Sequence, residues 1–317
     1  MNPLVSAVIP THKRPQLVQR AVRSALNQSY LNLEVIVVID GPEPQTVKAL
    51  EAFHSPSLRV IELPQNVGQS EARNAGVRAA RGEWIAFLDD DDEWLPQKTD
   101  RQIAFLAGAD PSTNFIVCRS QTADTAITRF WPRDFPHSGE NWSEYLACRG
   151  CFPAPSTYLV KKQLMMEVPF LKGLSSLEDF DWLLRVTATN QLMAGWLDET
   201  LAISHNDGHP ATRTTLKRDW DQFYQWILER RPLLTPRAFS HLLVSHGVPR
   251  IKRSQESPWS LCRSMLRLPF IAIFKGKADL HMYGLLATHI LLTENMRHRL
   301  RSLLESAHRR EIKVTAL

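Results

Sequence analysis

The chain has 317 residues, of which 44% are hydrophobic and 22% are charged. This composition is typical of a globular protein with a sizeable core, and it excludes disordered, collagen-like and disulfide-rich chains. No apolar run approaches the roughly 18 residues that a membrane-spanning helix requires. An apolar strand begins by Val5, with no basic leader ahead of it. We therefore expect a cytoplasmic protein.

The first hundred residues alternate short apolar runs with helical stretches. The predicted strands are Val5–Pro10, Leu33–Ile39, Leu58–Leu63 and Trp84–Leu88. The predicted helices between them are Pro15–Asn27, Pro44–Phe53 and Gly68–Ala80. Strands with near-continuous apolar sequence belong to parallel sheets that are covered on both faces. The pattern predicts an α/β fold with a doubly wound, mostly parallel sheet and a ligand site beyond the carboxyl ends of its strands.

The rest of the chain is less regular up to residue 175 and helical beyond Lys217. Strands are predicted at Asn114–Cys118 and Thr157–Lys161, and a helix is predicted from Glu178 to Thr189. The helices predicted after Lys217 are Arg218–Arg230, Pro236–Ser245, Pro258–Phe274 and Asp279–Ser306.

The net charge of +5 hides a division between two parts of the chain. Residues 1–216 contain 20 Lys and Arg against 25 Asp and Glu, whereas residues 217–317 contain 18 against 8. The change of charge and of pattern predicts a catalytic domain over residues 1–215 and a basic helical C-terminal region over residues 216–317. Such asymmetry indicates that the basic region meets something anionic.

Polar residues of interest follow the predicted strands at their carboxyl ends. Thr11 and Arg14 follow the first strand, Asp40 follows the second, and the run Asp89–Asp92 follows the fourth. On an open surface such a run would be a solvated acidic turn. Behind a buried strand, carboxylates that repel one another require a cation, and oxygen ligands select Mg²⁺ or Mn²⁺.

Several segments together resemble one known family. The matching segments are SAVIPTHKR, LEVIVVIDG, NVGQSEARNAGVRAARGEWIAFLDDDD, APSTYLV and LEDFDWLLRV, which span residues 5–187. They resemble the family-2 glycosyltransferases, an inverting family with the GT-A fold. The resemblance implies a nucleotide-sugar donor, expected to be UDP-linked, and a divalent metal, Mn²⁺ or Mg²⁺. It also implies transfer to a hydroxyl of a glycan or lipid-linked acceptor, as in cell-envelope polysaccharide synthesis.

The resemblance assigns donor-side roles to matching positions. Thr11 and Arg14 resemble positions that line the nucleotide, and Asp40 matches the acidic residue that hydrogen-bonds the base. A turn or helix-capping role is the alternative for Asp40. Arg73 and Asn74, in EARNAG, look like residues that face the nucleotide and phosphates.

The four aspartates match the family's Asp-x-Asp motif with an uncertainty of one residue. Asp91 is the expected metal ligand and Asp89 the expected ribose contact, with Asp90 and Asp92 as further candidates. His205 lies where many members have a histidine near the metal or diphosphate. A structural role is its alternative.

Glu178 and Asp179 resemble the Glu-Asp motif that supplies the catalytic base, here Asp179. An inverting transfer is one displacement, so the acceptor hydroxyl must lose its proton as it attacks. Helix capping is the alternative for Glu178, because acidic residues favour a helix start. The preceding segment VPFLKGLSSLED lacks the Gly-Phe-Asp stretch that is common in the family. The resemblance therefore assigns no role to the acceptor-side loop.

Two other functions compete with a glycosyltransferase. A nucleotidyltransferase would carry a glycine-rich loop after the first strand, where this chain has PTHKRPQ. An inactive sugar-nucleotide-binding protein would need neither acidic motif. The basic region contains two apolar segments, Ser264–Phe274 and Tyr283–Leu292. These segments either pack on the catalytic domain or lie on an anionic membrane surface. In the second case the protein would be peripheral on the inner face of the membrane. We expect no nucleic-acid partner, because no such motif accompanies the charge.

Overall fold

The computed structural model describes residues 2–123, 129–149, 152–174, 176–205, 220–247 and 250. The chain divides into two compact units, Met1–Lys217 and Arg218–Leu317. The predicted helices Pro258–Phe274 and Asp279–Ser306 lie outside the described residues, and so do both segments suggested to contact a membrane. Within the described ranges, no helix combines the length and the apolar character needed to cross a bilayer.

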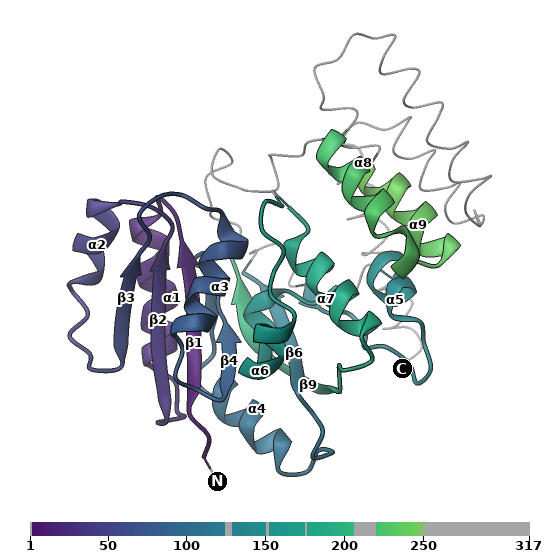
Figure 1. The fold of residues 1–317 in the computed structure, drawn as a ribbon. Helices are drawn as coiled ribbons and strands as arrows, with labels where there is room; N and C mark the ends of the chain where they lie inside the picture. Colours follow the sequence, from purple (N-terminus) through teal and green to yellow (C-terminus); the bar gives the residue numbers. More distant parts are fainter. Residues whose placement is uncertain are drawn as a thin grey trace, which may run out of the picture. The chain divides into compact units, whose positions relative to one another are not determined.

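The first unit begins with the predicted alternation of strands and helices. Its elements are β1 (Val5–Thr11), α1 (Pro15–Leu26), β2 (Leu33–Ile39), α2 (Pro44–Leu50), β3 (Leu58–Glu62), α3 (Gln69–Ala79) and β4 (Trp84–Phe87). Every residue of β1 and β2 is buried. This burial explains their apolar sequences, because helices cover both faces of the sheet. Figure 1 shows α3 on the near side of the sheet and α1 behind it.

The second half of this unit contains elements that the sequence predicted only in part. They are β5 (Asp92–Trp94), α4 (Lys98–Leu106), β6 (Phe115–Thr122), β7 (Phe130–Trp131), α5 (Trp142–Cys148), the 3₁₀ turn η1 (Pro155–Thr157), β8 (Tyr158–Lys161), α6 (Lys162–Glu167), α7 (Glu178–Ala188) and β9 (Ala194–Ser204). The predictions of β6, β8 and α7 are confirmed. The long strand β9 was not predicted, because it is only partly buried and lacks an apolar run.

The described strands form one sheet in the order β3-β2-β1-β4-β8-β6-β9-β5, with β7 paired to β6. Strands β3, β2, β1 and β4 are parallel, and so are β6 and β9. Strand β8 runs antiparallel to both of its neighbours. Only residues 88–91 separate β4 from β5, although these strands are far apart in the sheet order. The sheet therefore curls, and its β9–β5 end returns to the carboxyl end of β4.

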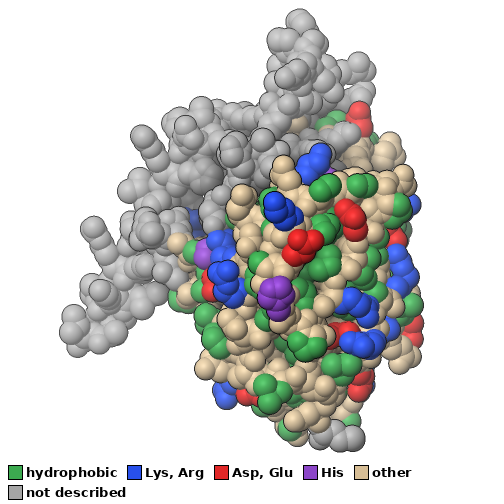
Figure 2. All heavy atoms as spheres, turned by 90° about the vertical axis from the view of Figure 1, so that its left-hand side faces the viewer, with side chains coloured by type: hydrophobic (Ala, Val, Ile, Leu, Met, Phe, Trp, Pro, Cys, Tyr) green, Lys and Arg blue, Asp and Glu red, His purple; other side chains and the backbone are tan. Residues whose placement is uncertain are grey.

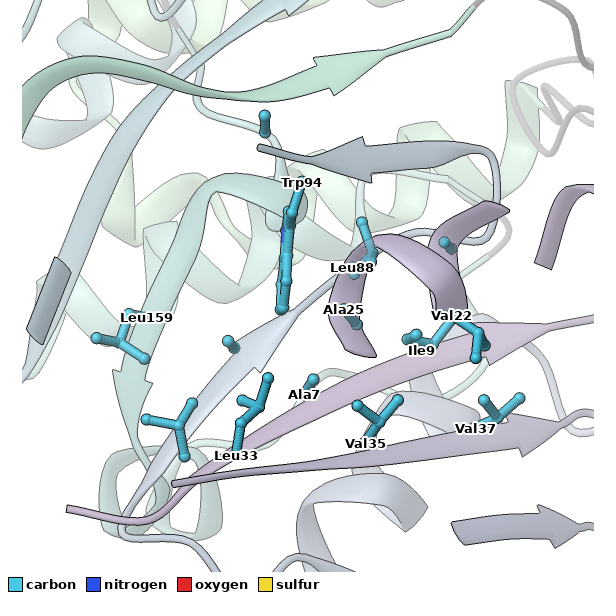
Figure 3. Close-up of a cluster of buried hydrophobic side chains, with 14 of the residues drawn as sticks. Ala7, Ile9, Val22, Ala25, Leu33, Val35, Val37, Leu88, Trp94 and Leu159 are labelled. Carbon is cyan, nitrogen blue, oxygen red and sulfur yellow. The ribbon is translucent and has the colours of Figure 1, made fainter. Parts of the chain in front are cut away.

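Trp94 of β5 closes the core beneath this curl. Its side chain is 2% exposed. Figure 3 shows its ring reaching from β5 toward buried side chains such as Leu88 and Leu159. On the other face, a Cβ added to Gly76 would lie 2.4 Å from Cγ1 of Val8, so only glycine lets α3 pack this closely on β1. This packing fixes the start of α3 beside the ends of β1 and β4.

The second unit is described only over its first helices. These are α8 (Trp220–Glu229), the short turn η4 (Arg231–Leu233), α9 (Pro236–Leu242) and the π-helical turn η5 (Leu243–Gly247). The hydroxyl of Thr235 caps α9 by accepting from the N–H of Ala238 at 3.1 Å. Helices at these positions were predicted, and the structure confirms them.

Figure 2 shows one face of the molecule, seen from the α2 side of Figure 1. Basic, acidic and histidine side chains are scattered there among uncharged groups. On the part of this face that the structure describes, charges of both signs are therefore mixed.

Candidate functional site

An acidic turn, Asp89–Asp92, follows β4 and leads directly into β5. The N–H of Asp92 donates to the carbonyl of Asp89 at 3.0 Å, which closes the turn. Asp90 and Asp92 are 5% and 6% exposed. The Asp89 and Asp91 side chains are 21% and 28% exposed. The turn therefore separates an accessible pair of carboxylates from a buried pair.

The buried Asp90 is held by the residues that follow β1. Its carboxylate accepts from the Thr11 hydroxyl at 2.7 Å and from the Arg14 guanidinium at 2.9 Å. Arg14 also donates to Asp91 at 3.1 Å. Burial raises the pKa of Asp90 to about 7, against the opposing effect of Arg14. Thr11 and Arg14, which were predicted to line the nucleotide, thus contact the acidic turn directly.

The buried Asp92 is held from the opposite side of the turn. Its carboxylate accepts from the hydroxyl of Ser156, in η1, at 2.5 Å. Burial raises its pKa to about 8, and the charges of Asp89 and Asp91 act in the same direction. The site thus contains a dense group of carboxylates that favours any added positive charge.

Arg73 of α3 connects this turn to the start of α7. Its guanidinium donates to Asp89 at 2.5 Å and to Glu178 at 3.2 Å, and it lies 5.3 Å from the centre of the Phe170 ring. The side chain is 1% exposed. Burial acts to lower the Arg73 pKa, but Asp89 and Glu178 outweigh it and raise that pKa. The structure buries Arg73 as a link between two acidic segments, and its predicted position facing the nucleotide stays a prediction.

Asn74, the neighbour of Arg73, is also turned toward the protein. Its side-chain amide donates to the carbonyl of Phe170 at 2.9 Å and accepts from the N–H of Phe170 at 3.0 Å. A side-chain amide that pairs with a backbone peptide in this way satisfies both partners. Asn74 therefore holds the chain before α7 against α3, and its predicted position facing the nucleotide and phosphates stays a prediction.

The start of α7 carries the predicted catalytic base. Of the carboxylates in its first turn, Glu178 pairs with Arg73, and Asp181 pairs with Arg185 at 2.6 Å. The Asp179 carboxylate accepts from the N–H of Phe180 at 2.8 Å. Burial raises the Asp179 pKa to about 7, the Glu178 charge adds to this, and Arg73 opposes it. A carboxyl group with such a pKa is suited to accept a proton near neutral pH.

Asp40 lies at the end of β2 and is 4% exposed. Its two oxygens accept from the N–H groups of Val67 and Gly68 at 2.7 and 2.9 Å. Gly68 precedes α3 with φ +90°, a conformation that favours glycine. Asp40 thus orders the entry to α3, as its turn-and-capping alternative requires. Each carboxylate oxygen has a second lone pair, so contact with a nucleotide base stays a prediction.

His205 directly follows β9, whose last residue, Ser204, pairs with Asp92. The imidazole Nε2 lies 3.1 Å from a carboxylate oxygen of Glu93. Among the described residues, no three His, Cys, Asp or Glu side chains are grouped so that they could hold a metal. The curl of the sheet brings His205 to the acidic turn without forming such a group.

The accessible pair, Asp89 and Asp91, fits a divalent cation of the Mg²⁺ or Mn²⁺ kind. Such ions commonly use one or two protein carboxylates and complete their shell with water and substrate phosphates. Burial raises the Asp91 pKa, and the nearby Asp89 charge raises it further. A cation between the two carboxylates would relieve that repulsion.

Comparison with protein families identifies the domain. The family model described as "Glycosyl transferase family 2" matches residues 6–162, from β1 to the start of α6. Residues 6–162 therefore form a glycosyl transferase family 2 domain.

The matched relatives are longer than the stretch that they share with this chain. This chain is 28% identical to an uncharacterized glycosyltransferase of Haemophilus influenzae over 186 residues, which are 58% of this chain and 62% of that protein. It is 41% identical to the succinoglycan biosynthesis protein ExoO of Rhizobium meliloti over 109 residues, 34% of this chain and 31% of that one.

Solved structures share the fold. TarS of S. aureus, residues 1–349 in complex with UDP-GlcNAc, matches with a TM-score of 0.55 and 16% identity over 90% of this chain and 79% of that one. The mannosyltransferase PcManGT of Pyrobaculum calidifontis, in complex with GDP-Man and Mn²⁺, matches with a TM-score of 0.53 and 19% identity over 94% and 83%. The curled, mostly parallel sheet is thus the GT-A fold.

Two residues of the site were not predicted from the sequence. Ser156 contacts Asp92 across 64 positions of the chain, and Phe170 lies under Arg73 across 97. Neither stands in a run of charged residues. The segment APSTYLV was the one available signal for Ser156, because it is among the segments that resemble the family.

Proposed function

We propose that this chain is an inverting, metal-dependent glycosyltransferase. It transfers a sugar from a nucleotide-sugar donor, UDP-linked, to a hydroxyl of a glycan or lipid-linked acceptor. The observation that carries this proposal is the buried Arg73, because its contacts with Asp89 and Glu178 join the donor-side carboxylates to the first turn of α7, which contains the base. The similarity to ExoO, which is named for succinoglycan biosynthesis, supports a role in polysaccharide assembly.

On the donor side, Asp91 holds the metal and Asp89 contacts the ribose. When bound, Mn²⁺ or Mg²⁺ supplies positive charge for the departing nucleoside diphosphate. Asp90 and Asp92 are buried and hold the turn in shape, whereas the accessible pair, Asp89 and Asp91, is held by Arg73 and Arg14 and keeps a partly exposed side toward the donor. Thr11 and Arg14 support the same turn from the end of β1.

On the acceptor side, Asp179 removes the proton of the attacking hydroxyl. Because Arg73 neutralises Glu178 and Arg185 neutralises Asp181, the Asp179 carboxylate is the proton acceptor of this helix turn. Its raised pKa makes it a stronger base than an ordinary aspartate. Inversion follows from a single displacement in which the hydroxyl attacks opposite to the leaving diphosphate.

A screen of nucleotide-sugars against the full chain tests the proposal. UDP- and GDP-linked sugars are added with Mn²⁺ while the melting temperature is followed. A donor at about 100 times its Kd stabilises the native state by about 2.7 kcal/mol. We expect Mn²⁺-dependent stabilisation by one donor and slow hydrolysis of that donor without acceptor. Asp91→Asn is the control and should lose the metal-dependent part. Binding without any turnover would favour an inactive binding protein.

We also propose that the basic C-terminal region places the enzyme at an anionic membrane surface. The support is the net charge of residues 217–317, with 18 Lys and Arg against 8 Asp and Glu. Sedimentation of the full chain with phosphatidylglycerol vesicles should exceed that with phosphatidylcholine vesicles, and it should fall as salt is raised. Equal sedimentation with both would contradict the proposal.

A further inference from the structure

The segment Pro155–Tyr158 is attached to the residues that follow the acidic turn. Three successive carbonyls of this segment each accept a hydrogen bond from a buried side chain of residues 94–102. The pairs are Trp94 with Ser156 at 2.8 Å, Gln102 with Thr157 at 2.9 Å, and Lys98 with Tyr158 at 3.3 Å. Such a series fixes the backbone of the segment relative to the turn.

One of these three hydrogen bonds comes from a buried lysine. Lys98 is 0% exposed, and its ammonium lies 4.2 Å from the centre of the Trp94 ring and 2.8 Å from Gln102. A buried cation is costly unless its donors are satisfied. Here an amide, a carbonyl and an aromatic face surround it.

The hydroxyl of Ser156 connects the fixed segment to both ends of the acidic turn. It accepts from the N–H of Asp89 at 3.1 Å and donates to the carboxylate of Asp92 at 2.5 Å. Ser156 is 1% exposed, so this hydroxyl is enclosed by protein. One buried group therefore holds the first and the last residue of the turn.

We infer that Ser156 is a positioning residue for donor and metal binding. It fixes the direction in which Asp89 and Asp91 face the ligand, and it acts through the backbone of Asp89 and the side chain of Asp92. The inference rests on the proposed function, because it takes the accessible pair, Asp89 and Asp91, as the donor and metal site. Ser156 itself touches neither ligand.

The test compares Ser156→Ala with Thr157→Val by calorimetric titration of the full chain with UDP and with GDP, each in the presence of Mn²⁺. Thr157 is a matched control, since it is 0% exposed and its hydroxyl donates locally, to the carbonyl of Ala154 just before the segment at 2.6 Å, rather than to the acidic turn. A ten-fold change in Kd corresponds to about 1.4 kcal/mol, which is about the contribution of one protein hydrogen bond. We expect the nucleotide Kd to rise about ten-fold in Ser156→Ala and to stay unchanged in Thr157→Val.

Three further readouts separate positioning from a general loss of structure. In Ser156→Ala the donor KM should rise more than kcat falls. The pH profile of kcat should keep its midpoint, because Asp179 lies on α7. Ser156→Thr, which keeps the hydroxyl, should recover part of the affinity.

Equal Kd values for the wild type and Ser156→Ala would overturn the inference alone. The same increase in Thr157→Val would also overturn it, because the effect would then be general. If wild-type protein binds neither nucleotide with Mn²⁺, the proposed function fails and the inference fails with it.

Discussion

The acidic turn Asp89–Asp92 and the first turn of α7 are both crowded with carboxylates, but they manage the repulsion differently. In the acidic turn, Asp90 and Asp92 are buried, whereas Asp89 and Asp91 stay partly exposed and pair with Arg73 and Arg14. In α7, arginines pair with Glu178 and Asp181 on either side of Asp179. The first arrangement leaves a partly exposed pair of carboxylates for a cation, and the second leaves a single carboxylate for a proton. The same residue type thus serves two purposes through its partners.

The largest expected effect is on the single carboxylate of α7. Asp179→Asn keeps an acceptor for the N–H of Phe180 but removes the base. We expect kcat to fall by about 10³-fold, within the usual range for a general base. The calorimetric Kd for UDP with Mn²⁺ should stay within about two-fold, as expected when the acidic turn is unchanged. Activity close to that of the wild type would remove Asp179 from the mechanism.

Next in size is the loss of Arg73, which belongs to both acidic segments. Arg73→Met leaves Asp89 and Glu178 without their shared cation in a buried place. We expect the free energy of unfolding, measured in urea, to fall by about 3–5 kcal/mol. Arg78→Met is the control on the same helix. Arg78 is 52% exposed, so its pair with Glu71 is screened by solvent and should contribute less than about 0.5 kcal/mol. Equal losses of unfolding free energy in both variants would show that Arg73 does not stabilise the two acidic segments more than a surface ion pair does.

A smaller effect concerns pH and the buried pair of the acidic turn, Asp90 and Asp92. The pKa values of Asp90 and Asp92 are raised to about 7 and about 8. The native state then binds more protons than the unfolded state between the ordinary aspartate pKa of about 4 and these values. Stability of the metal-free protein should therefore fall as pH rises through this window.

Binding of Mn²⁺ to the accessible pair should also depend on pH, because the metal binds ionised carboxylates and the pKa of Asp91 is raised by burial and by the nearby Asp89 charge. We expect the increase in melting temperature on adding Mn²⁺ to be larger at pH 8 than at pH 5.5. In Asp91→Asn the pH dependence of this increase should be weaker. An increase that is independent of pH in the wild type would contradict the assignment of the accessible pair to a cation.

The smallest effect is expected at the residue before α7. Leu177 has φ +68°, a left-handed conformation that Asn adopts more readily than Leu. Leu177→Asn should change the free energy of unfolding by about 1 kcal/mol at most, with relief of backbone strain set against lost apolar contact. A fall in kcat with an unchanged free energy of unfolding would show instead that Leu177 helps to position the Asp179 carboxylate.

Local pattern by itself determined the first half of the fold. Strands β1 and β2 are buried on both faces, so their sequences are apolar throughout and can be read without neighbours. The same pattern placed Asp40 and the acidic turn at strand ends. The helical pattern also placed the Glu-Asp pair at a helix start, and α7 does begin at Glu178.

Only the tertiary structure decided what each of these groups touches. The contact of Arg73 with Glu178 spans 105 positions, and that of His205 with Glu93 spans 112. Strand β5 has just three residues, and β9 is partly exposed, so neither carries a local signal. Their pairing curls the sheet and sets which aspartates of the turn point inward. Contacts of this range depend on packing of the whole domain, and a local pattern does not contain them.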